Sequence, residues 1–114
     1  MKPNAFNTIL FTALMVFTET TSAASCRVIK QAGMLATYWE IKATGVEDVP
    51  GVCGGLWDNL KRFPACIVVH DASCRDEGSG RLRWYFGIDA GCNNGMVQST
   101  WWEATKNKYG AVGC

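Results

Sequence analysis

His70 is the only histidine of the chain. A histidine side chain can act either as a general acid or as a general base. A histidine that works with a carboxylate and an arginine can cleave a phosphodiester by general acid–base catalysis, as ribonucleases do. Glu103 would supply the carboxylate, and Arg81 or Arg83 the guanidinium. Ile67 and Val69, which precede His70 in the same predicted strand, are expected to face the core, which places the histidine on the solvent face. A lone exposed histidine is usually only a surface residue, so we expect no catalytic residue and no enzymatic activity.

Five tryptophans give a second candidate chemistry, because indole rings stack on sugar rings and on bases. Four of them occupy positions that face the predicted core: Trp39, Trp57, Trp84 and Trp101. Trp102 cannot point inward together with its neighbour, so we expect it to be exposed. Trp102, Arg81 and Arg83 are therefore the candidate binding surface, although a mixed, solvated distribution of charge is the simpler reading of the basic residues.

Six cysteines follow residue 25, and their even number in a short chain predicts three disulfides. The alternative of a metal site is weak, because no two cysteines have two residues between them and only one histidine is present. We expect no metal and no other cofactor.

Residues 1–24 have the three parts of a secretory signal peptide. Lys2 is followed by the short apolar run 9–17, and small residues then allow cleavage after Ala23 or Ala24. The run is shorter than the roughly 20 residues needed to span a bilayer, so we expect no stable membrane insertion. Removing residues 1–24 takes one of 11 bases and one of 10 acids, which leaves ten against nine. A net charge of +1 is too small for a binder of phosphate backbones, so we expect no nucleic-acid partner.

Residues 25–114 are predicted to form one α+β domain. Strands are expected at 27–30 and 35–43, with Gly33 marking a bulge or a tight turn between them. A helix follows over 49–63, then a strand at 66–72, a hairpin partner at 82–88, a second helix capped by Asn93 or Asn94, and a short last strand at 111–114. This order is that of a split βαβ, or ferredoxin-like, antiparallel sheet with both helices on one face.

Several features together make the chain similar to small, cysteine-rich fungal effectors with the smut killer-toxin fold. They are the signal peptide, a cysteine that opens the mature chain, Val-Cys-Gly-Gly-Leu-Trp in the first helix, Gly-Cys-Asn-Asn before the second helix, and the terminal Cys114. The resemblance implies secretion and action on a host or on competing fungi. The chain departs from that family, because it has fewer cysteines than killer-toxin subunits and because an additional strand is expected at 34–43.

The split βαβ arrangement selects one disulfide pairing from the 15 that six cysteines allow. Its first and last strands are neighbours, which brings Cys26 to Cys114. The hairpin brings Cys66 to Cys92, and the two remaining cysteines, Cys53 and Cys74, lie at the opposite end of the sheet.

We expect a secreted, extracellular, non-catalytic effector that acts in the host's extracellular space or across its interface. It is expected to act as a monomer, on a surface molecule of a host or competitor. The alternatives are a killer toxin directed at other fungi and a small secreted ribonuclease-like protein.

Overall fold

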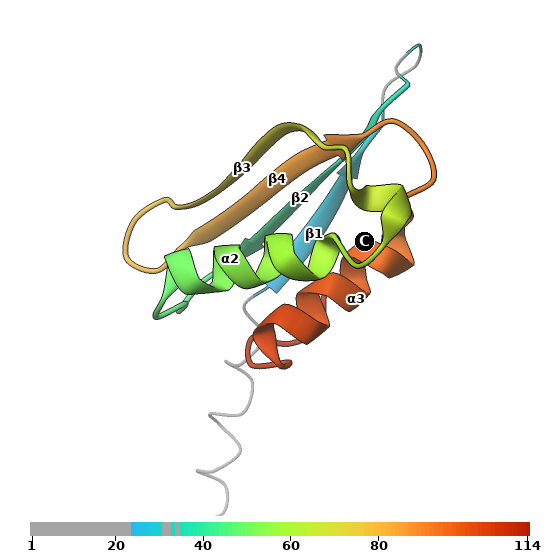
Figure 1. The fold of residues 1–114 in the computed structure, drawn as a ribbon. Helices are drawn as coiled ribbons and strands as arrows, with labels where there is room; N and C mark the ends of the chain where they lie inside the picture. The colour runs from blue at the N-terminus through green and yellow to red at the C-terminus, as the bar shows by residue number, and fades with distance from the viewer. Residues whose placement is uncertain (1–23, 31–32, 34) are drawn as a thin grey trace, which may run out of the picture.

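The computed structural model describes residues 24–30, 33 and 35–114, which form a four-stranded antiparallel sheet and two helices (Figure 1). The expected signal peptide lies outside the described residues except for Ala24, which begins the first strand. The elements in chain order are β1 (Ala24–Ile29), β2 (Thr37–Ala43), α2 (Val49–Leu60), the short 3₁₀ helix η2 (Pro64–Cys66), β3 (His70–Asp76), β4 (Leu82–Ile88) and α3 (Asn94–Thr105).

The strand order of the sheet is β1-β2-β4-β3, with every neighbouring pair antiparallel. β1 and β2 form a hairpin through Gly33, whose φ of 86° belongs to a turn. The predicted last strand at 111–114 is not formed, and that prediction was wrong. β1 pairs with β2 at the edge where the ferredoxin-like order would place the last strand, so the described sheet does not establish that order.

Both helices lie side by side on one side of the sheet, as Figure 1 shows. Alternate residues of the two central strands face these helices and are buried: Trp39, Ile41, Ala43, Leu82, Trp84, Phe86 and Ile88. Trp57 of α2 meets the rings of Trp84 and Phe86 edge-on, and Trp101 of α3 is fully buried. The four tryptophans predicted to face the core therefore do so, because a domain of this size needs large side chains to exclude water.

α2 begins where the sequence predicts and ends three residues early. The Asp48 side chain caps it by accepting a hydrogen bond from the Gly51 amide at 3.1 Å. Gly55 lies at the contact of α2 with α3 and not with the sheet: a Cβ there would lie 3.7 Å from that of Ala104. Gly54 faces open space and has no such role.

The strand predicted at 66–72 begins only at His70 in the structure. Pro64–Cys66 forms η2 instead. Ile67, which was expected to face the core, is exposed, as is Val68, whereas Val69 packs against the core as expected. Their β-branched side chains suit a strand, but strand propensity depends on neighbours, and the backbone here turns before it reaches β4.

Three disulfides join the elements in the predicted pairing: Cys26–Cys114, Cys53–Cys74 and Cys66–Cys92. Cys114 was expected to reach the first strand from a strand at 111–114, and that expectation was wrong. It reaches β1 from an irregular segment. The Cys114 amide donates to Oε1 of Gln98 at 3.0 Å, which attaches this segment to α3.

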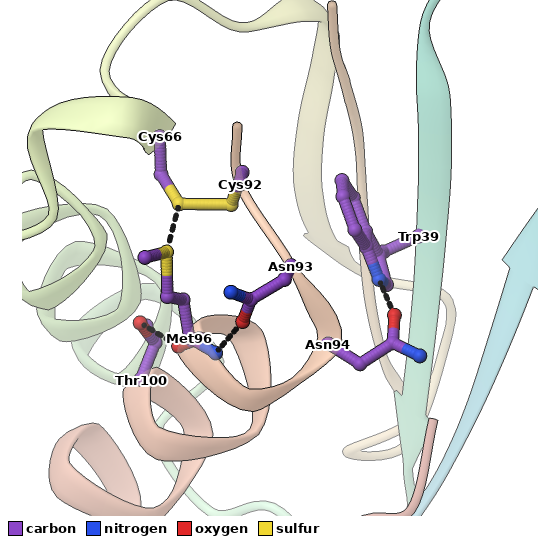
Figure 2. The surroundings of a disulfide bond; sticks show 7 residues. All are labelled: Trp39, Cys66, Cys92, Asn93, Asn94, Met96 and Thr100. Carbon is purple, nitrogen blue, oxygen red and sulfur yellow. Dashed lines mark hydrogen bonds between the residues drawn. A yellow bond between two sulfur atoms is a disulfide. The ribbon is translucent and has the colours of Figure 1, made fainter. Parts of the chain in front are cut away.

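Figure 2 shows how the Gly-Cys-Asn-Asn segment fixes the start of α3. Cys92 holds it to η2 through Cys66, whose sulfur lies 3.7 Å from that of Met96. Asn93 is the cap, since its side chain accepts from the Met96 amide at 2.9 Å. The next residue, Asn94, accepts from the indole of Trp39 at 2.9 Å. The two asparagines therefore have different roles: one starts the helix, and the other binds it to the sheet.

Candidate functional site

The side of the sheet opposite the helices carries a continuous set of polar and aromatic side chains, which we call the open face. It arises from strand alternation, because every residue between two core positions points the other way. Its members on β1 and β2 are Arg27, Tyr38, Glu40 and Lys42, and those on β3 and β4 are His70, Ser73, Arg75, Arg83 and Tyr85.

Glu40 lies at the centre of the open face between two arginines. Its Oε2 accepts from Nε of Arg83 at 2.7 Å, and its Oε1 accepts from Arg27 at 3.1 Å. The Glu40 side chain is only 10% exposed. Burial by itself raises the pKa of this carboxyl, but the hydrogen bond from Arg83 and the charges of Arg83, Arg27 and Lys42 outweigh it, so the pKa lies below its ordinary value. Glu40 is therefore an anion at neutral pH, and it orders two cations.

An aromatic stack continues from this cluster along the sheet. The guanidinium of Arg83 lies over the Tyr85 ring at 4.6 Å from its centroid, and Tyr38 stacks on Tyr85 at 5.5 Å. A Cβ on Gly87 would clash with the Tyr38 ring, so only glycine lets that ring rest on the backbone of β4. The Tyr38 hydroxyl donates to Asp71 at 2.7 Å. That hydrogen bond is the main reason that the pKa of Tyr38 lies above its ordinary value, with desolvation and nearby negative charge acting in the same direction.

The three residues of the predicted binding surface do not lie together. Arg83 belongs to the open face. Arg81 lies in the loop between β3 and β4, where its guanidinium donates to the carbonyl oxygens of Gly78 and Glu77 at 3.0 Å each and so closes the loop. Trp102 is 46% exposed, as expected, but it belongs to α3 on the helical side of the sheet.

The residues of the hypothetical ribonuclease site are separated as well. Nε2 of His70 lies 3.0 Å from Oδ1 of Asp89, within ion-pair distance, without the geometry of a hydrogen bond. Glu103 is exposed on α3, across the molecule from Arg83. The sheet lies between the histidine and its expected carboxylate, so these groups cannot act on one bond.

Seven members of the open face were missed as candidates: Arg27, Tyr38, Glu40, Lys42, Ser73, Arg75 and Tyr85. For the members on β2 and β4, the signal that could have found them is the alternation of core residues with polar residues, tyrosine and Gly87. It assigns a face to each residue, but it does not say which strands are neighbours. Only the pairing of β2 with β4 brings Glu40 beside Tyr85 and Lys42 beside Arg83.

The described part of the chain has no pocket, and no group of three potential metal ligands occurs among its residues. None of the helices in the described ranges is long and apolar enough to cross a membrane. Comparison with models of known families, with curated proteins and with solved structures finds no match for this chain.

Proposed function

We propose that this protein is a secreted, non-catalytic binding protein of the fungal effector type, which acts outside the producing cell through the open face of its sheet. The observation that carries the proposal is the Arg27–Glu40–Arg83 cluster with its stacked tyrosines. These side chains form a flat, ordered array on a rigid sheet, which suits recognition of another surface. Three disulfides in one small domain agree with an oxidising, extracellular setting.

The open face favours binding over acid–base chemistry. A general base works best when its pKa lies near the working pH, and Glu40 has a pKa below that of an ordinary glutamate. Both of its oxygens are engaged by arginines. His70 does not lie in the same cross-strand row as Glu40: its register partner is Gly87, and it lies beside Asp89. Among the described residues of the open face, Glu40 and His70 are therefore not poised on either side of a common position.

The proposal keeps the similarity to effectors with the smut killer-toxin fold and treats the fold as a variant of the ferredoxin-like arrangement. In this variant β1 takes the edge beside β2, and β4 lies between β2 and β3. Cys114 retains its link to the edge strand, although the segment before it is irregular. The expected partner is a surface molecule of a host or competitor, bound by a monomer.

Expression in leaf tissue with and without residues 1–24, beside a growth assay on yeast and filamentous fungi, tests the proposed function. We expect export of a chain that begins at Ala24 or Ser25, together with a plant response that requires export. Secreted material that still begins at Met1 would contradict the signal peptide. Inhibition of fungi without a plant response would replace the effector with a killer toxin.

A further inference from the structure

Three cations of the open face stand directly beside one another on neighbouring strands. Lys42 is the register partner of Arg83, and Arg83 is the register partner of Arg75. Neighbouring strands are about 4.8 Å apart, so this cationic row crosses roughly 10 Å of β2, β4 and β3. Like charges directly opposite one another destabilise a sheet, so the row has a cost that the fold alone does not require.

The acids of the protein do not neutralise the cationic row. Glu40 pairs with Arg83 but shares its charge with Arg27. Arg75 meets only Glu77, at 3.5 Å, and Lys42 makes no ion pair with any residue of the described chain. Asp76 follows Arg75 at the same end, but its Oδ1 accepts from the Gly78 amide at 2.7 Å, and it makes no ion pair with any described residue. Two further acids, Asp71 and Asp89, belong to the opposite end of the face, beside Tyr38 and His70. The open face is therefore polarised along its strands, although the whole chain is close to neutral.

The tyrosines beside the cationic row distinguish between possible anions. A single-stranded nucleic acid would need a free ring face on which to stack a base. The Tyr85 ring lies between the guanidinium of Arg83 and the ring of Tyr38. Both faces of the Tyr85 ring are therefore already in contact with side chains of the protein. What remains available is cationic nitrogen, and guanidinium groups match carboxylates in a two-pronged geometry. Regularly spaced carboxylates on a polymer would suit such a row.

An anionic membrane fits the arrangement less well. Binding at a lipid surface combines cations with apolar side chains that enter the acyl boundary. The exposed apolar residues Leu35, Ile67 and Val68 precede β2 and β3, at the end of the sheet away from the cationic row, and Trp102 lies on the helical side. No single orientation places the cationic row and these apolar residues against one bilayer.

We infer that the cationic row binds a linear carboxylated polysaccharide of the polyuronate class, with Lys42 and Arg75 at its two ends and Arg83 between them. This inference rests on the proposed function, since it names the ligand class of the same open face. Arg83 is held in place by Glu40, whereas the outer two cations are exposed and contact the polymer from either side.

Calorimetric titration of the purified protein with oligogalacturonate tests the inference. We expect saturable binding that weakens with salt, and no binding to the fully methyl-esterified oligomer. The double variant K42Q/R75Q should bind about tenfold more weakly, which corresponds to about 1.4 kcal/mol. The matched control K61Q/R62Q also removes one lysine and one arginine, but at the end of α2 on the helical side, and should bind as the wild type does. If K42Q/R75Q does not fold, K42Q alone serves, since Lys42 has no ion pair to lose.

Four results would overturn the inference: no saturable binding of oligogalacturonate, an equal loss of affinity in the control, tighter binding of single-stranded RNA, or tighter binding of phosphatidylserine–phosphatidylcholine vesicles. The leaf assay separates this outcome from failure of the proposed function. If K42Q/R75Q abolishes the plant response although the wild type has no affinity for the polyuronate, the open face is retained and only this ligand is rejected. If the wild type binds the polyuronate but causes no plant or fungal response, the ligand is retained and the proposed function is rejected.

Discussion

The two faces of the sheet share the same strands but order their side chains by different means. On the helical side, Trp39, Trp84 and Phe86 are buried by α2 and α3 and are held by packing. On the open face, Tyr38, Glu40 and Arg83 are ordered without a covering layer, by ion pairs and ring stacking. Packing of the first kind stabilises the fold, whereas the second kind leaves directed polar groups in contact with solvent. The difference separates the scaffold from the candidate binding surface within single strands.

Adjacent residues of β4 give the most direct test of this difference, and the largest expected effect. Trp84 is fully buried, and its replacement by alanine should lower the free energy of unfolding by about 4 kcal/mol. Tyr85→Ala, one residue further on the open face, should cost about 1–2 kcal/mol, because it removes the stack with Tyr38 and the contact with the Arg83 guanidinium. Urea denaturation of both variants measures this; similar losses would mean that the open face also supports the fold.

Removal of the disulfide between α2 and β3 should have the next largest effect. The Cys53→Ala/Cys74→Ala variant frees a loop whose ends are 21 residues apart. Chain entropy then predicts a loss of about 3 kcal/mol. Thermal unfolding of the variant against the wild type measures it, and a change within experimental error would show that the helical layer holds to the sheet by packing alone.

Glu40 gives the pH dependence of the open face. Because its pKa is lower in the folded protein than the ordinary 4.5, its contribution to stability is present above pH 4.5 and is lost as the pH falls through the folded value. Glu40→Gln should cost about 2 kcal/mol at neutral pH. It should also flatten the acid limb of the stability curve. An unchanged acid limb in this variant would mean that other carboxyls cause the dependence.

His70→Ala should have the smallest effect, below about 0.5 kcal/mol, with fold and activity retained. Its partner Asp89 and the histidine itself are both well exposed, and surface ion pairs contribute little. Circular dichroism and the leaf assay check it. A folded variant without activity would revive the enzymatic alternative.

The sequence predicts local structure well where a side chain has one strong requirement. Pro50 suits the first turn of α2, and alternation assigns Trp84 and Phe86 to the core. The pairing of the cysteines that the structure has was selected by the expected sheet order, although that order is not established. The sequence predicts neighbours across the sheet poorly. The short segment at 111–114 and β1 both suit an edge strand, and only the hairpin through Gly33 decides in favour of β1.

The candidate site follows the same division. Alternation assigns Lys42 and Arg83 to the solvent face of their strands, but Arg75 lies beyond the strand predicted at 66–72. Nothing local indicates that three strands place these cations in one row. Trp102 was easier to identify as a candidate, because a tryptophan that directly follows a buried one in a helix points toward solvent. Charge clusters formed by register are invisible until the strand order is known.

Mapping of backbone amide shifts by NMR during titration with oligogalacturonate tests most directly that the open face, and not the helical side, is the binding surface. The predicted result is a set of perturbed amides at Lys42, Arg83 and Arg75, with α3 unchanged. Perturbations centred on Trp102 and its neighbours in α3, with the open face silent, would contradict it.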